Sequence, residues 1–362
     1  MITIIRNWVN RLFAEEETVV LLLLLIVALV LIVTLGGVLA PLIASIVFAF
    51  MMQGMLGQMT RRGAPRWLAI SVAYLIFMAM FFGFIFGLMP LVWTQLTSLI
   101  QELPALLRKL QQSLLLLPER SELISEAQVR EFVGVAGAEV GKFGQSVVSF
   151  SIAQIPNLFG LLLYLVLVPI LVFFLLKDKD QILRWLASFL PRRRPLMVKV
   201  WNEMNDQVAN YVRGKGIEIV IVGAATYISF IWLDLNYAAL LALLVGLSVV
   251  IPYIGAAVVT VPVLLVAFLQ WGTGTEFYTL FIVYGIIQGL DGNVLVPLLF
   301  SEVVNMHPVA IIVSVLVFGG IWGLWGVFFA IPLATLVKAI INAWPTHGNA
   351  SGSAPNEEIS AS

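Results

Sequence analysis

The segment VVLLLLLIVALVLIV, at residues 19–33, has no polar side chain, and comparable apolar segments recur along most of the chain. A helix of about 20 apolar residues spans the hydrocarbon core of a bilayer. Because 61% of the residues are hydrophobic and only 11% are charged, the chain has too few polar side chains to cover a water-soluble fold. We therefore predict an all-α polytopic membrane protein with about eight membrane segments.

Apolar length and helix-breaking residues divide the chain into regions. Gly36 and Gly37 separate the first two expected spans, and Pro118 is expected to end an amphipathic helix that begins near residue 95. Spans are expected at about 18–35, 38–52, 68–93, 155–176 and 277–290. The N-terminal half is predicted to hold three membrane segments within 1–94, then an extracytoplasmic amphipathic helical region at 95–153. A fourth membrane segment with a basic cytoplasmic amphipathic region is expected at 154–216. A C-terminal transport core with broken helices at 217–345 and a disordered cytoplasmic tail at 346–362 complete the prediction.

Lys and Arg residues predict the orientation, because the short cytoplasmic loops of membrane proteins are enriched in them. Residues 53–67 hold three of them and 177–216 hold nine, whereas 95–153 hold five against six acidic residues. We expect the N-terminus, both basic segments and the C-terminal tail to face the cytoplasm, and 95–153 to lie outside. The expected membrane-surface anchors are Arg61, Arg62, Arg192, Arg193, Arg194, Arg213 and Lys215.

The C-terminal half contains two apolar stretches that are too long for one simple span. Tyr237–Gln270 would form a helix of about 51 Å, against about 30 Å of hydrocarbon, and IPYIGA interrupts it. Pro308–Trp344 is similar, and GGIWGLWG interrupts it. Each stretch can be a re-entrant hairpin of two half-helices or one kinked, tilted span, and we favour at least one hairpin. The expected breaks are Pro252, Gly255, Pro297, Gly323, Gly326 and Pro332.

Two broken stretches on either side of one span indicate an inverted repeat, which in secondary transporters marks the substrate site. The polar cluster DGNVLVPLLFSEVVNMHP lies between them, and such side chains beside backbone freed by proline can bind a cation or a polar solute. An apolar setting also favours the protonated form of a carboxylate, which suits proton coupling. No Lys or Arg occurs between residues 217 and 337, so a salt bridge would need a basic residue from elsewhere. The candidate pathway residues are Asp291, Asn293, Glu302, Asn305, His307, Gln288 and Tyr253, with Tyr227 as a further lining candidate.

Less specific interpretations of the same residues stay open. The glycines can simply let helices pack closely, and the polar cluster can be an ordinary loop at the membrane surface. His307 can cap the helix that follows it. Glu218, Asp234 and Glu276 are expected to be solvated residues at the ends of membrane segments.

Several classes of function lack their sequence signals. The chain has no cysteine and two histidines, so neither a metal site nor another cofactor is expected. None of the patterns GxxxxGK[ST], GxSxG and HExxH occurs, and we predict that the protein is not an enzyme. The net charge of zero indicates no nucleic-acid partner.

Five sequence motifs occur in a specific order: FFLLKDKD (Phe173–Asp180), YVRGKG (Tyr211–Gly216), IPYIGA (Ile251–Ala256), DGNVLVPLLFSEVVNMHP (Asp291–Pro308) and GLWGVFFAIPLA (Gly323–Ala334). Together they resemble the autoinducer-2 exporter family, also known as PerM-like permeases. The resemblance covers nearly the whole chain up to about Trp344, and it is least distinctive in residues 1–150.

The resemblance implies an eight-segment protein of the bacterial inner membrane, a homo-oligomer that is expected to be pentameric, and an elevator-like mobile half that carries the substrate. Some members of the family are linked to export of autoinducer-2 and others to sodium/proton exchange. The leading hypothesis is therefore a secondary transporter that exports a small polar metabolite of the autoinducer-2 type and is driven by protons. The alternatives are a sodium/proton antiporter and a membrane scaffold that binds a partner through residues 95–153 without transport.

Overall fold

Every secondary-structure element that the computed structural model describes is a helix, within residues 16–115, 134, 142, 158–192, 194–252, 254–300 and 306–343. Seven helical segments in these ranges are long and apolar enough to cross a membrane, and α9 (Ala238–Ser248) is a shorter apolar helix. The prediction of an all-α polytopic membrane protein is therefore confirmed. The seven segments are Val19–Arg61, Arg66–Ala105, Gly160–Lys177, Pro195–Trp232, Ile254–Trp271, Thr275–Phe300 and Pro308–Phe328.

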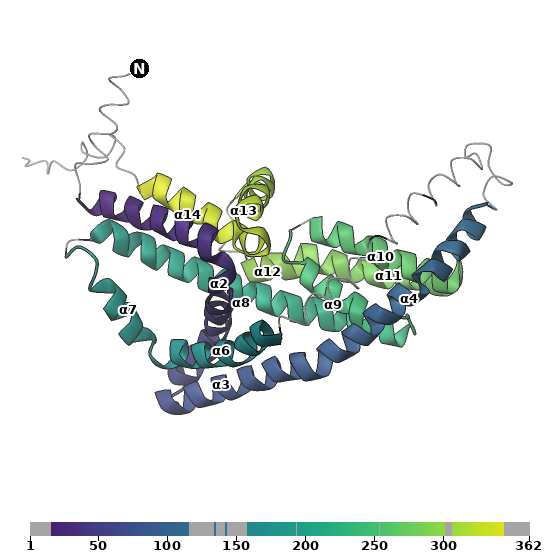
Figure 1. The fold of residues 1–362 in the computed structure, drawn as a ribbon, viewed down its shortest axis with the longest axis horizontal. Helices are drawn as coiled ribbons and strands as arrows, with labels where there is room; N and C mark the ends of the chain where they lie inside the picture. Colours follow the sequence, from purple (N-terminus) through teal and green to yellow (C-terminus); the bar gives the residue numbers. More distant parts are fainter. Residues whose placement is uncertain are drawn as a thin grey trace, which may run out of the picture.

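The first two predicted spans form one helix. α2 (Glu16–Arg61) passes through Gly36 and Gly37 without ending, so the predicted end of a span at these glycines is wrong. Pro41 lies inside α2, and Figure 1 shows that the helix bends sharply part-way along. We attribute the bend to Pro41, because a proline ring clashes with the preceding turn and lacks an N–H group. A bend therefore replaces the predicted break.

The third predicted span continues directly into the amphipathic region. α3 (Arg66–Gly83) leads into the π-helical turn η1 (Phe84–Leu88) and then into α4 (Met89–Leu115). The predicted break at Pro118 lies outside the described residues. α6 (Leu158–Lys177) occupies the fourth predicted span, and the short helix α7 (Lys179–Ala187) follows it.

The longest helix of the C-terminal half is α8 (Pro195–Trp232), with 38 residues. Its first residue is a proline, which is favoured there because the first turn of a helix has no internal partner for its N–H groups. The N–H of Met197 instead donates to Glu17 Oε1 at 2.6 Å, so the start of α2 caps the start of α8. α8 contacts α2 on one side and α9 on another, and it thereby joins the two halves of the chain (Figure 1).

The first long apolar stretch is a helical hairpin formed by α9 and α10 (Ile254–Trp271), which we call the first hairpin. Its two ends lie together, because the side chain of Gln270 contacts the residues that precede α9. The Gln270 amide accepts the N–H of Asn236 at 2.8 Å and donates to the carbonyl of Asp234 at 2.7 Å. This stretch therefore turns back on itself and is not one tilted span.

The turn of the first hairpin depends on glycine. A Cβ atom on Gly255 would lie 1.8 Å from the carbonyl oxygen of Ser248, a separation that no side chain can tolerate. Pro252 lies in the same turn, which follows the end of α9. The close approach of the two helices at this point is therefore specified by the IPYIGA sequence.

The second long stretch forms a second hairpin from α13 (Pro308–Phe328) and α14 (Ala330–Ala343). α13 is interrupted at Gly323, whose φ of 60° and ψ of −137° are not helical. A Cβ atom on Gly326 would lie 1.8 Å from the carbonyl oxygen of Phe318. The reversal of the chain thus requires glycine in the same way as in the first hairpin.

The segment between the hairpins is one continuous helix. α11 (Thr275–Leu290) leads into the π-helical turn η3 (Asp291–Leu295) and then into α12 (Val296–Phe300). Pro297 lies within α12, so the predicted break at Pro297 is wrong. The N–H of Val296 donates five residues back, to the carbonyl of Asp291, as in a π turn. This wider turn directly precedes the proline, and the helix continues through it.

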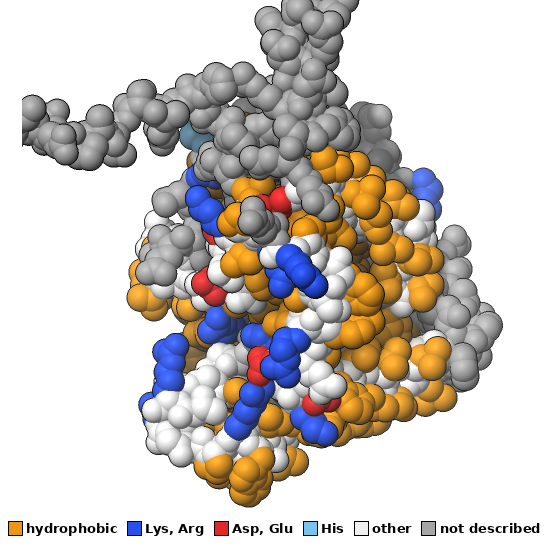
Figure 2. Space-filling view, turned by 90° about the vertical axis from the view of Figure 1, so that its left-hand side faces the viewer, with side chains coloured by type: hydrophobic (Ala, Val, Ile, Leu, Met, Phe, Trp, Pro, Cys, Tyr) orange, Lys and Arg blue, Asp and Glu red, His pale blue; other side chains and the backbone are white. Residues whose placement is uncertain are grey.

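Two apolar cores stabilise the halves of the molecule. The N-terminal core joins α2, α3 and α6 around Phe77 and Val172, and the C-terminal core joins α8, α9, α10 and α11 around Leu241 and Val263. Figure 2 looks onto the end of the molecule that lies at the left in Figure 1, and it shows Lys and Arg side chains gathered there among apolar ones.

Candidate functional site

A buried ion pair lies near the middle of α8. Lys215 Nζ lies 2.8 Å from Oε2 and 3.1 Å from Oε1 of Glu218, and the two residues are 4% and 1% exposed. Their spacing of three positions places both side chains on one face of the helix. Ionisable side chains inside membrane proteins are expensive and usually mark a pathway for a substrate or an ion. The pair is therefore the starting point for the candidate site.

The tip of the first hairpin, of which the structure describes residues 249–252 and 254, contacts this pair. Lys215 Nζ also donates to the carbonyl oxygen of Val249 at 2.7 Å, and it lies 5.1 Å from the centre of the Phe300 ring. Val249 is the C-cap residue of α9, and carbonyl groups at a helix C-terminus have no partner within the helix and carry a partial negative charge. The ammonium group therefore joins α8 to the hairpin tip through a charge-assisted hydrogen bond.

Asp291 adds a second carboxylate. It begins the π-helical turn η3 and interacts electrostatically with both Lys215 and Glu218. Its Oδ1 atom is buried, as is Nε2 of Gln288 one turn earlier, and neither has a hydrogen-bond partner in the part of the chain that the structure describes. Buried polar atoms without partners are costly, so these two atoms mark a place where a proton, an ion or a polar solute can be held.

We call Lys215, Glu218, Gln288 and Asp291 the ion cluster. It contains one ammonium group and two carboxyl groups, so one negative charge is uncompensated when both carboxyl groups are ionised. The absence of Lys and Arg from residues 217 to 337 means that no second basic side chain is available from that half. The cluster can therefore become neutral by taking up one proton or one monovalent cation.

The local sequence explains how these groups come together. Glu218, Val222, Thr226 and Phe230 are buried at four-residue spacing, so one face of α8 packs against the first hairpin and carries the carboxylate with it. Asp291 reaches the same region from a π turn, and such turns occur often at functional sites.

The structure separates the other sequence candidates from the ion cluster. Asn293 is exposed, and its amide donates at 2.9 Å to the carbonyl of Gly289 in its own helix. His307 is also exposed and caps α13, because its Nδ1 accepts the N–H of Val309 at 3.3 Å. Tyr227 is partly buried among apolar residues of the C-terminal core. Tyr253, Glu302 and Asn305 lie outside the described residues.

Three sequence expectations need correction. The sequence predicts Lys215 as a surface anchor and Glu218 as a solvated residue, but the two are buried against each other. They lie well inside α8 and not at the end of a span, because the helix extends 20 residues before Lys215. Opposite charges three positions apart in one helix were the available signal for this pair. Pro332, a predicted break, lies in the first turn of α14, where a proline is tolerated.

Of the remaining predicted anchors, Arg213 lies within α8, Arg61 and Arg62 lie at the end of α2, and Arg192 and Arg194 lie between α7 and α8. Arg194 donates to the carbonyl of Ala187 at 2.6 Å, and the half-buried Arg213 donates from Nε to the carbonyl of Ala209 at 2.9 Å. Arg193 lies outside the described residues. Their anchoring to a membrane surface stays a prediction. The exposed members of the set are Arg61, Arg62 and Arg192.

The tip of the second hairpin, residues 323–329, also packs on α8, but through aromatic rings. Tyr211, one turn before Lys215, is buried and lies edge-on to Phe328 with ring centres 5.9 Å apart. Trp325 and Phe329 stack within the tip at 6.4 Å. Both hairpin tips therefore meet the YVRGKG segment of α8.

Comparison with known proteins places this architecture among membrane transporters. The sequence matches the family described as AI-2E family transporter over residues 19–346, which include both hairpins and the ion cluster. PerM of Escherichia coli strain K12, which bears the provisional name of a permease, is 46% identical over 95% of this chain and 98% of its own length. YueF of Bacillus subtilis strain 168, which bears the provisional name of a transport protein, is 27% identical over 76% of each chain.

Proposed function

Because the chain belongs to the AI-2E transporter family, we propose that it is a secondary transporter that exports a small polar metabolite of the autoinducer-2 type in exchange for protons. Family membership supports membrane transport in general, and the relatives bear transport names. The proposal adds to this the identity of the substrate and the coupling of its export to protons. The observation that carries it is the ion cluster, which has one uncompensated carboxyl group and contacts the tip of the first hairpin through Lys215.

In this proposal Asp291 takes up and releases the coupling proton. Lys215 stays paired with Glu218 through a direct ion pair, so a proton on Asp291 makes the cluster neutral. A neutral cluster costs much less to move through an apolar environment than a charged one. The movement that carries the substrate is then favoured only when Asp291 is protonated, which couples the proton to the transport cycle.

The mobile part in this proposal consists of the two hairpins and the helix between them. Its elevator-like movement would pass along α8, on which both tips pack through Lys215 and Tyr211. The first hairpin is suited to move as one unit, because its two helices pack closely at Gly255 in the tip and Gln270 joins its two ends by hydrogen bonds. Discontinuous helices of this kind form the substrate and ion sites of many secondary transporters.

Sodium/proton antiport is the second candidate, and the two carboxyl groups of the ion cluster favour it. Hard cations prefer carboxylate and amide oxygen ligands, which Glu218, Asp291 and Gln288 can supply. In this case the cation would compete with Lys215 for the carboxylates, and protons would leave when the cation binds.

We further propose that the protein lies in a bacterial inner membrane with both termini in the cytoplasm, as a homo-oligomer with a pentamer as the expected form. The Lys and Arg side chains gathered at one end of the molecule support the cytoplasmic side of this arrangement (Figure 2). Cross-linking of the protein in native membranes would measure the number of subunits.

The test uses inside-out vesicles that contain the protein, in which export is measured as uptake of labelled autoinducer-2 with and without a proton gradient. We expect gradient-dependent uptake that is lost in Asp291→Asn. Glu276→Gln is the matched control, because Glu276 is an exposed acid in the first turn of the same helix.

Uptake that persists at the wild-type rate in Asp291→Asn, at equal expression, would contradict the role of Asp291. If correctly oriented wild-type protein takes up no autoinducer-2, that substrate is excluded. Release of protons on addition of sodium would then support the antiporter, and its loss in Asp291→Asn would place Asp291 in that pathway. A phenotype that needs residues 95–153 but not Asp291 would support the scaffold.

A further inference from the structure

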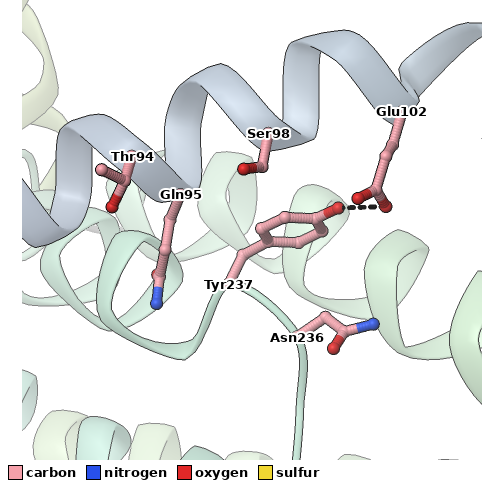
Figure 3. A pocket seen from close by; sticks show the side chains of 6 residues that line it. All are labelled: Thr94, Gln95, Ser98, Glu102, Asn236 and Tyr237. Carbon is pink, nitrogen blue, oxygen red and sulfur yellow. Dashed lines mark hydrogen bonds between the residues drawn. The ribbon is translucent and has the colours of Figure 1, made fainter.

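A second polar site lies at the opposite end of the first hairpin from the ion cluster. Here α4 runs past the loop that leads into α9, and an open pocket of about 330 Å³ lies between the two elements (Figure 3). Every residue that lines the pocket has a polar side chain, which is unusual in a chain with 61% hydrophobic residues. The lining residues are Thr94, Gln95, Ser98 and Glu102 from α4, and Asn236 and Tyr237 from the loop.

Two hydrogen bonds hold the walls of this pocket together. Tyr237 Oη donates to Glu102 Oε2 at 2.5 Å, and the N–H of Leu240 donates to Gln95 Oε1 at 2.9 Å. Tyr237 is the N-cap residue of α9 but makes no capping bond with its own side chain, so Gln95 caps the helix from α4. The pocket is therefore preorganised by contacts between residues that are 135 and 145 positions apart.

The backbone of the loop is also held in an unfavourable conformation. Asp234 and Tyr237 have φ values of 57° and 60°, and they are the residues other than glycine with positive φ in the described ranges. Such conformations cost about 1 kcal/mol or more each and persist where the surrounding structure enforces them, often at sites that bind a ligand. The strain supports a function for this loop beyond connecting two helices.

The groups that remain free in the pocket include both donors and acceptors. The second oxygen of Glu102 can accept, the NH₂ group of Gln95 can donate, and the hydroxyl of Ser98 and the amide of Asn236 can do both. None of these groups has a hydrogen bond to another described residue. Figure 3 shows these side chains around the ring of Tyr237.

We propose that this pocket binds a small, uncharged solute that carries several hydroxyl groups. A hydroxyl group both donates and accepts, so it matches the mixed lining better than an ammonium group, which would leave the Gln95 and Asn236 donors without partners. An anion is disfavoured by Glu102, because the lining contains no Lys or Arg. Planar amide and carboxylate groups can contact neighbouring hydroxyl groups in pairs, and the face of Tyr237 can pack against C–H groups.

The proposal deepens the proposed function by naming a solute class and a second place where it binds. A solute in this pocket would contact α4 from the N-terminal half and the base of the first hairpin from the C-terminal half. It would thus stabilise one position of the hairpin relative to α4. The binding itself does not depend on the proton coupling proposed for Asp291.

The experiment measures binding of ribitol to the full chain in lipid nanodiscs without any ion gradient, by isothermal titration calorimetry. We expect saturable binding by the wild type and binding that is weaker by about tenfold or more in Ser98→Leu, whose side chain would fill the pocket. Gln101→Leu is the matched control, because Gln101 is exposed on α4 and does not line the pocket. Asn236→Ala is a second pocket variant that adds no bulk, and we expect binding weaker by about fivefold.

Binding that is weakened in both pocket variants and unchanged in the control would support the proposal. Absence of saturable ribitol binding by folded wild-type protein would overturn it, as would equal binding by the wild type and both pocket variants. If the pocket bound ethanolammonium and not ribitol, the proposal of an uncharged solute would also be overturned. Because no gradient is present, failure of proton-coupled uptake in vesicles and failure of ribitol binding remain distinct results.

Discussion

The two hairpin tips are built alike in their backbones and differ in their side chains. In each tip a glycine lies so close to an earlier carbonyl that a Cβ atom would be 1.8 Å from the oxygen, at Gly255 and at Gly326. Each tip also packs on the YVRGKG segment of α8. The first tip meets Lys215 through a backbone carbonyl, whereas the second meets Tyr211 through aromatic rings.

This difference indicates that the two tips have different tasks, coupling at the first tip and structural support at the second. An ammonium group and two carboxyl groups can respond to a proton or a cation, so the first tip is suited to coupling. Aromatic packing has no titratable response and provides buried apolar area and a defined position, so the second tip is suited to support. The comparison therefore predicts that changes at the first tip alter coupling and that changes at the second tip alter stability alone.

The largest effect is expected from Lys215→Met, which breaks the ion pair at the first tip. Glu218 would be left buried without its partner, and such changes cost about 3–5 kcal/mol of the free energy of unfolding. The double variant Lys215→Met with Glu218→Leu should recover most of this stability, because it removes both charges, but it should not recover proton-coupled uptake. Thermal unfolding in detergent measures the first effect and the vesicle assay the second. A Lys215→Met protein as stable as the wild type would mean that the pair does not stabilise the first tip.

The shared backbone of the two tips is tested by Gly255→Ala and Gly326→Ala. Each added methyl group would overlap a carbonyl oxygen, so both variants should lose about 3 kcal/mol of stability, by similar amounts. Gly289→Ala is the control, because a Cβ atom there would have no close neighbour. Unfolding temperatures of the three variants would show the pattern, and a large loss at one tip alone would refute the common construction.

The separation of tasks is tested at the second tip by Phe328→Leu. This change keeps an apolar side chain but removes the ring that packs on Tyr211, and it should cost about 1 kcal/mol of stability. The dependence of uptake on the proton gradient should be unchanged, because the ion cluster does not include this side chain. Uptake that loses its gradient dependence in Phe328→Leu would show that both tips take part in coupling.

The hairpins could be predicted from the sequence because their signals are local. Pro252 and Gly255 lie within four residues of each other, and the glycines near 323 interrupt an otherwise apolar run. Their effect on the chain needs no distant partner. Pro297 shows the limit of this reasoning, since a π turn next to it allowed the helix to continue where a break was predicted.

The ion cluster could be predicted only in part, because its composition depends on tertiary packing. Asp291 stands out in sequence as an acid between apolar segments, but Lys215 is buried by a contact with Val249, which lies 34 positions later. The count over residues 217–337, which hold no Lys or Arg, starts two positions after this lysine, so it misses the partner of Glu218. The polar pocket was missed for the same reason, since its walls join residues more than 100 positions apart.

The most local effect is expected at the base of the first hairpin, where Gln270 joins the two ends. Gln270→Ala removes one hydrogen bond to Asn236 and one to Asp234, and it should cost about 1 kcal/mol. Because the tip contacts are untouched, the loss should be local, and hydrogen exchange should become faster at residues 234–240 while α8 keeps its protection. Gln101→Ala, at an exposed glutamine of α4, should leave hydrogen exchange unchanged both at residues 234–240 and in α8. Faster exchange along the whole of α8 in Gln270→Ala would mean that the base and the tip of the hairpin open together, and the two ends of this hairpin could then not be treated as separate sites.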